Sequence, residues 1–160
     1  MKRTVISLVM ITFIAAITIT SLSAQTVPYT WKKYGISFAI PKTHDVSKNS
    51  TDEFESGDEQ TWLQMFPFTD GSETAQGMIE KVAAQGKFSI EEEGEYTSGG
   101  YDGYWLQCSS ATYPEWQYWL IGFIDPASET NFYSIIWWKK GDDAAYKIAY
   151  DMSYSFKKMK

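Results

Sequence analysis

The sequence is poor in the two residues that most often build cross-linked or reactive sites. Its 160 residues include one cysteine, Cys108, and one histidine, His44. A single cysteine cannot form an intramolecular disulfide, so the stability of the fold has to come from its packed core. We expect Cys108 to be a small buried apolar residue on a strand. A free reactive thiol and an intermolecular bridge are the alternatives.

The same scarcity limits the metal sites that the chain can build. A zinc site takes about four Cys, His or carboxylate ligands, which leaves only a carboxylate-rich site of the kind that suits Ca²⁺. Acidic residues gather in two stretches, 52–59 and 91–95. Neither stretch has the spacing of a calcium-binding loop, and charge runs are typical of solvated surface. We therefore predict no metal site and no cofactor.

Nucleophilic catalysis by serine or cysteine would need His44 as its base, since the chain has no other histidine. His44 lies in a polar stretch, and no G-x-S-x-G motif is present, so we interpret this histidine as an exposed loop residue. A carboxylate-dependent hydrolase stays open as an alternative, because the separation of two catalytic carboxylates is set by the tertiary fold.

The N-terminus carries a long apolar run, in which Lys2 and Arg3 precede Val5–Ile19 and the small residues Ser21–Ala24 follow. This order of basic, apolar and small residues is typical of a cleaved secretory signal. A membrane anchor is the alternative, but about 15 apolar residues fall short of the roughly 20 that span a bilayer. No cysteine follows the run, which excludes a lipoprotein signal. We predict a signal peptide over residues 1–24 and an exported protein, periplasmic or secreted.

Cleavage after Ala24 leaves residues 25–160, a length that suits one domain with a single core. Loss of Lys2 and Arg3 leaves 12 basic and 20 acidic residues, a net charge of about −8. Such a surface repels phosphate backbones and anionic headgroups. We therefore expect no nucleic-acid partner and no stable membrane anchor after cleavage. Cationic or neutral partners fit this charge.

Strand patterns occupy most of the mature chain. Two short strands joined by a tight turn are predicted within Thr30–Ile40, followed by a polar loop over Lys42–Asp52. The next predicted strand, Thr61–Phe68, has apolar residues on both of its faces, which indicates that both faces are covered. Long strands separated by glycine-containing turns fill Phe88–Lys139 and predict an antiparallel meander.

Apolar residues recur at steps of three and four over Glu73–Gln85 and again over Asp142–Met152. This spacing predicts two amphipathic helices, one near each end of the mature domain. Two helices and a doubly covered sheet define the expected fold. It is an α+β fold, a three-layer α/β/α sandwich with a central, mainly antiparallel sheet.

The order of these elements resembles the PsbP/Mog1-like domains found among exported bacterial proteins. The likeness covers nearly all of residues 29–158 and rests on YGISFAIP at the start of the domain, the GGYDGYW hairpin and the closing Tyr154-Ser155-Phe156. The resemblance implies a fold that serves as an assembly factor or binding module. It carries over no catalytic residues.

Aromatic residues make up 17% of the chain, and several tryptophans fall in the last three predicted long strands. Aromatic side chains supply large contact area with a polar edge, which suits them to grip a partner or to form the core. The candidate ligand-binding residues are Trp105, Trp137, Trp138 and Tyr101, and we expect Trp105 to be the most exposed of the tryptophans.

These observations predict an exported, non-enzymatic binding or assembly module. Its partner is an extracytoplasmic protein or a small ligand held by aromatic residues of the sheet. A secreted carboxylate-dependent hydrolase and a carbohydrate-binding module are the alternatives.

Overall fold

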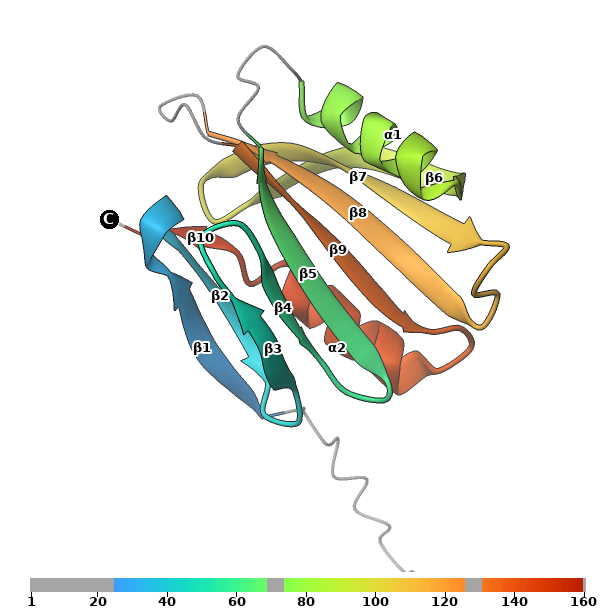
Figure 1. The fold of residues 1–160 in the computed structure, drawn as a ribbon, viewed down its shortest axis with the longest axis horizontal. Helices are drawn as coiled ribbons and strands as arrows, with labels where there is room; N and C mark the ends of the chain where they lie inside the picture. The colour runs from blue at the N-terminus through green and yellow to red at the C-terminus, as the bar shows by residue number, and fades with distance from the viewer. Residues whose placement is uncertain (1–24, 69–73, 126–130, 160) are drawn as a thin grey trace, which may run out of the picture.

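The computed structural model describes residues 25–68, 74–125 and 131–159. Its main element is a seven-stranded sheet in the order β3-β4-β5-β9-β8-β7-β6, in which all neighbouring strands are antiparallel (Figure 1). The strands are β3 (Asp45–Asn49), β4 (Phe54–Gly57), β5 (Thr61–Phe68), β6 (Phe88–Ser98), β7 (Tyr101–Ser110), β8 (Trp116–Ile124) and β9 (Asn131–Lys139).

A second, three-stranded sheet in the order β1-β2-β10 lies beside the large one (Figure 1). It consists of β1 (Thr26–Trp31), β2 (Ile36–Pro41) and the short β10 (Lys157–Lys158). A 3₁₀ turn over Lys32–Tyr34 and Gly35 at φ +62° connect β1 to β2, and this positive φ favours glycine. The stretch predicted to hold two strands, Thr30–Ile40, contains most of β2 but only the last two residues of β1, and the separate sheet was not predicted.

Two helices cover opposite faces of the large sheet, as expected for a three-layer sandwich (Figure 1). Helix α1 (Ala75–Gly86) packs on β6, β7 and β8, whereas α2 (Asp143–Ser153) packs on β5, β9 and β2. Each helix begins at a side-chain cap. Thr74 accepts a hydrogen bond from the backbone N–H of Gly77, and Asp142 accepts two, from Ala144 and Ala145.

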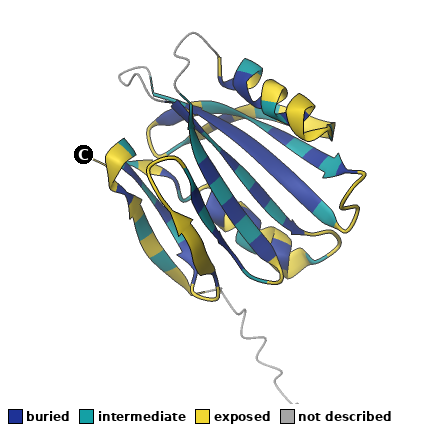
Figure 2. Cartoon of the chain, in the orientation of Figure 1, coloured by how far each residue is buried: buried dark blue, intermediate teal, exposed yellow. Residues whose placement is uncertain are grey.

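The sheet separates two apolar clusters. The larger cluster lies between the sheet, α2 and the small sheet, and includes Phe38, Phe54, Phe123 and Phe156. The smaller lies under α1. Figure 2 shows the central strands buried and the outer strand β3 exposed. Because each helix covers only part of its face, strips of sheet beside both helices stay open.

The stretch predicted as a polar loop contains strand β3, so that prediction was wrong over Asp45–Asn49. All five side chains of β3 are exposed, and a bulge interrupts its pairing with β4. A strand with no buried face lacks the apolar alternation by which a strand is detected in sequence. It is held by the backbone hydrogen bonds of the hairpin and by polar side-chain contacts of Ser47, Lys48 and Asn49.

The prediction of an exposed histidine was also wrong, because His44 is only 8% exposed. Its Nδ1 lies 3.2 Å from Oγ of Ser56 on β4, and its Nε2 lies 2.8 Å from Oγ1 of Thr61 on β5. Burial lowers the pKa of His44, and the nearby Asp58 carboxylate only partly opposes this. The two hydroxyls satisfy the ring, so His44 is a structural residue of the hairpin.

Cys108 on β7 is fully buried beneath α1, which confirms the expected placement. Desolvation raises the pKa of its thiol to about 12. The predicted signal peptide, residues 1–24, lies outside the described residues. Within the described part of the chain, no helix is long and apolar enough to cross a membrane.

Candidate binding site

A groove of about 200 Å³ runs between α2 and the β6–β7 side of the large sheet. It forms because α2 lies over β5 and β9, so that the same face of β6 and β7 has no helix above it. We call it the aromatic groove, and its aromatic lining comprises Tyr96, Trp105, Trp119, Tyr146, Tyr150 and Tyr154. Two polar residues of adjacent strands, Glu92 and Gln107, complete its floor.

Helix α2 and its C-cap residue, Tyr154, contribute three tyrosines to the groove. Tyr146, Tyr150 and Tyr154 follow one another at steps of four and therefore lie on one side of the helix. The three residues are 44%, 44% and 49% exposed, and their ring centroids lie 6.4 Å apart for the first pair and 4.7 Å apart for the second. This row is exposed and apolar, in contrast to the opposite side of α2, which packs into the core.

The sheet contributes two tryptophans. The Trp119 ring on β8 forms the back wall, 5.4 Å from Tyr146 and 6.2 Å from Tyr150 between centroids. Its Nε1 donates to Oε1 of Gln107 at 3.1 Å, which fixes the plane of the indole. The Trp105 indole on β7 is half-buried and lies over Gly94 of the edge strand β6.

The pKa values of two phenol groups in the groove, those of Tyr96 and Tyr154, are raised. Desolvation, aided by the neighbouring Tyr150, raises the pKa of Tyr154. Tyr96 is buried, its hydroxyl donates to the Ser153 carbonyl, and desolvation raises its pKa as well. The groove therefore offers ring faces, hydroxyl groups and one carboxylate. It contains no nucleophile paired with a base.

The structure separates the four predicted ligand-binding residues. Trp105 lines the aromatic groove, whereas Trp138 is 4% exposed and packs behind it, 4.7 Å from Trp119 and 5.7 Å from Tyr146. Tyr101 is 3% exposed and sits edge-on against core phenylalanines. Trp138 and Tyr101 thus present almost no surface to a ligand. Trp137, adjacent to Trp138 in sequence, points to the other face of the sheet.

Trp137 belongs to a second aromatic surface, on the face of the sheet that α1 covers only in part. Its ring stacks on Trp62 of β5 at 5.7 Å with an angle of 2° between the planes, and Phe66 stacks on Tyr133 nearby. All four side chains are half-buried. We call this strip over β5 and β9 the open aromatic face. A hollow of about 370 Å³ adjoins it beside Tyr118.

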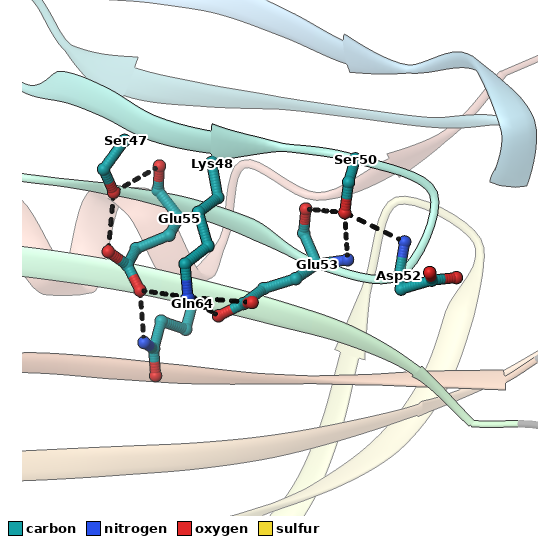
Figure 3. Close-up of polar contacts among 7 residues, drawn as sticks. All are labelled: Ser47, Lys48, Ser50, Asp52, Glu53, Glu55 and Gln64. Carbon is teal, nitrogen blue, oxygen red and sulfur yellow. Dashed lines mark hydrogen bonds and ion pairs between the residues drawn. The ribbon is translucent and has the colours of Figure 1, made fainter.

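A polar network borders the open aromatic face on the β3–β4 hairpin (Figure 3). Glu55 accepts hydrogen bonds from Ser47 and from Gln64, both at 2.6 Å. Lys48 pairs with Glu53 at 2.9 Å and approaches Glu55 at 3.7 Å. The hydrogen bonds from Ser47 and Gln64 lower the pKa of Glu55. Glu55 is therefore ionised and already partnered.

The pKa values of the carboxyl groups do not support the alternative of a carboxylate-dependent hydrolase. A general acid in such an enzyme needs a raised pKa, yet in the described residues each carboxyl group with a shifted pKa is lowered. Hydrogen bonds from Ser109 and Gln117 lower the pKa of Glu91. At Asp58, burial acts to raise the pKa but hydrogen bonds from Thr43 and two backbone amides outweigh it. The described residues contain no cluster of three His, Cys, Asp or Glu suited to a metal ion.

Reasoning from the sequence missed the tyrosine row of α2. Its signal was present, since Tyr146, Tyr150 and Tyr154 alternate with the apolar stripe that predicted the helix. Their importance depends on where α2 lies over the sheet. A row of exposed tyrosines becomes the wall of a groove only because α2 stops short of β6 and β7.

The layers, the topology and the position of both helices define a PsbP/Mog1-like fold. No protein-family model matches the chain, and no curated protein matches its sequence. Solved structures of similar fold include cyanobacterial PsbP (CyanoP) from Synechocystis, with a TM-score of 0.61 and 14% identity over 84% of this chain and 93% of that one.

Two further structures share the fold. The Ran-binding protein Mog1p of Saccharomyces cerevisiae has a TM-score of 0.57 and 10% identity, covering 84% of this chain and 95% of its own. LpqN of Mycobacterium tuberculosis, involved in cell envelope biogenesis, has a TM-score of 0.53 and 12% identity, covering 85% of this chain and 91% of its own. At these identities the likeness establishes the fold alone. The expected resemblance is therefore confirmed for the fold.

Proposed function

We propose that this protein is an exported, non-enzymatic binding module that holds a protein partner or a small ligand in the aromatic groove. The single observation that carries this proposal is the groove itself, a concave site lined by six aromatic rings, of which those of Trp105, Tyr146, Tyr150 and Tyr154 are exposed or half-buried. Aromatic side chains in such positions dominate binding energy in protein interfaces. The lowered carboxyl pKa values and the buried, fully partnered His44 support a role without catalysis.

Proteins of this fold give further support, because Mog1p is a Ran-binding protein. A PsbP/Mog1-like domain thus serves elsewhere as a module that binds another protein. The partner that we propose for this chain lies outside the cytoplasm. The N-terminal sequence of the protein recovered from its native cell tests this part of the proposal. Export predicts a chain that begins at Gln25.

Affinity capture with the mature protein tests the groove. We expect a double variant, Trp105→Ala with Tyr150→Ala, to recover at least about tenfold less partner from extracytoplasmic extract, because two aromatic anchors are each worth 1 kcal/mol or more. Tyr113→Ala is the matched control, since Tyr113 is 57% exposed and does not line the groove. Equal recovery by the wild-type protein and the double variant rejects the groove as the binding site.

A carbohydrate-binding module is a second candidate, favoured by the open aromatic face. The parallel rings of Trp62 and Trp137 lie next to Gln64 and Glu55, and this combination of ring faces and planar polar groups suits sugar rings. Affinity electrophoresis in soluble glycan tests it. Retardation that is lost in Trp62→Ala but kept in Trp105→Ala would assign sugar binding to this face, and unretarded wild-type protein would reject it.

A further inference from the structure

We infer that the aromatic groove binds a cationic side chain, a lysine ammonium or an arginine guanidinium inserted by a partner protein. This inference rests on the proposed function, because it names the chemistry of the ligand at the same site. It is carried by three features of the groove: the arrangement of its rings, its charge and its size.

The rings of Trp119, Tyr146 and Tyr150 form the cup in which the cation would lie. Their centroids are 5.4, 6.2 and 6.4 Å apart, and both tyrosines are inclined at 62° to the indole. Tyr146 and Tyr150 are exposed, whereas Trp119 is 8% exposed and meets both of them in an edge-type contact. A cation in the groove would therefore lie against the two tyrosine rings, within the ~6 Å reach of a cation–π contact, with the indole behind them. Aromatic side chains grouped in this way are used by proteins to recognise ammonium groups.

The charge of the groove favours a cation as well. Of the described residues that line it, only Glu92 is charged, and no lysine or arginine is among them. Glu92 lies on β6 opposite Gln107, so its carboxylate stands at the rim on the same side of the sheet as the rings. The net charge of about −8 after signal cleavage adds a field that attracts cations and repels anions.

The size of the groove decides between a side chain and a free small molecule. Pockets that enclose drug-sized ligands measure about 300–1,000 Å³, whereas the groove measures about 200 Å³. It has room for one long side chain, with the aliphatic stem against the rings and the charged head near Glu92. We therefore assign the cation to a partner protein and not to a free cofactor.

The test is a titration of the ¹⁵N-labelled protein, followed by the NMR signals of the tryptophan indole N–H groups. The probes are the acetyl methylamides of lysine, arginine and norleucine, the last of which keeps the apolar stem without the charge. We expect saturable shifts of the Trp105 and Trp119 signals with lysine and arginine in the range of roughly 1–50 mM. Norleucine should bind at least about tenfold more weakly, and the Trp62 and Trp137 signals should stay unchanged.

Two substitutions of equal charge provide the control. Glu92→Gln should weaken lysine binding several-fold, whereas Glu93→Gln, on the opposite side of the same strand, should leave it unchanged. Tyr150→Leu, which removes a ring but keeps an apolar side chain, should weaken it about tenfold. Both positions on β6 and Tyr150 are exposed, so these variants are expected to fold.

The inference is overturned if norleucine binds as tightly as lysine, if neither cation shifts the Trp105 and Trp119 signals, or if Glu92→Gln and Glu93→Gln behave alike. A failure of the proposed function gives a different result. If the groove is not the binding site, its substitutions leave partner capture unchanged. If capture depends on Trp105 and Tyr150 but the cations do not bind, the groove is the site and its ligand is not cationic.

Discussion

The indole of Trp105 lies over Gly94 of the neighbouring strand, so closely that a Cβ placed on Gly94 would stand 2.9 Å from the indole Nε1. The two residues are direct cross-strand partners of β7 and β6. Only a residue without a side chain lets the ring rest on the sheet at this point. The position of Trp105 at the edge of the groove thus depends on a glycine.

Gly94→Ala should displace the Trp105 ring without removing any aromatic group. The methyl group meets the far end of a side chain and not the backbone, so the ring can turn away. We expect the free energy of unfolding to change by less than about 1 kcal/mol, because alanine also recovers the conformational entropy cost of glycine. The Trp105 indole N–H signal should shift and partner capture should weaken. An unmoved Trp105 signal would contradict this account.

Replacing Trp105 and replacing Trp138 with alanine should have different effects on stability and on binding. Trp138→Ala removes a ring that is 96% buried between Trp119 and the core, so it should destabilise the fold by about 3–5 kcal/mol. Trp105→Ala, at a half-buried position, should cost less than about 2 kcal/mol while it weakens binding. Urea denaturation measures both values. Equal destabilisation by the two substitutions would place Trp105 in the core.

Because His44 is buried, we expect the free energy of unfolding to fall in mild acid. Burial lowers its pKa in the folded protein below the unfolded value of 6.5, so the unfolded chain binds the proton more readily. The stability that neutral His44 contributes is therefore complete above about pH 6.5 and is lost as the pH falls from there through the folded pKa. The slope cannot exceed about 1.4 kcal/mol per pH unit, the value for one proton.

His44→Gln, which keeps hydrogen-bonding capacity, should flatten the curve of unfolding free energy against pH between about pH 5 and 7. Asp58 does not confound this window, because its pKa is lowered from 3.8 and it titrates in stronger acid. Denaturation at a series of pH values measures the curve. Parallel curves for the variant and the wild-type protein would show that His44 does not titrate as its burial requires.

Cys108 should be inert toward thiol reagents in the folded protein. It is fully buried under α1 and the pKa of its thiol is raised to about 12, so both access and the thiolate fraction are small. Ellman's reagent should label one thiol per chain in denaturant and almost none without it. Rapid labelling of the native protein would mean that α1 leaves the sheet readily. The assay also checks the folding of every variant above.

The sequence predicted most of the fold because most of its elements have one buried face or stripe. The periodicity over Glu73–Gln85 and Asp142–Met152 located both helices to within a few residues, and the long strands followed from apolar alternation and glycine turns. Strand β3 was not predicted because it has no buried face. The small sheet was not predicted because its third strand is only two residues long and pairs with β2 from the far end of the chain.

The candidate site was less predictable. Trp137 and Trp138 had to point to opposite faces, but which of them reaches a surface depends on where α2 lies. The burial of Tyr101 follows from contacts with Phe123 and Phe132, which lie on other strands. The groove is present because α2 packs on β5 and β9 and leaves β6 and β7 uncovered. Local sequence patterns do not indicate where on a sheet a helix will pack.

The most direct test of the central claim, that the ligand is held in the aromatic groove, is photo-crosslinking in the native cell. A photoreactive p-benzoyl-phenylalanine replaces Tyr150 in the groove or, as the matched control, Tyr113 near the hollow on the other face. The account predicts a covalent adduct with one partner from position 150 and none from position 113. An adduct from position 113 with position 150 silent would contradict it.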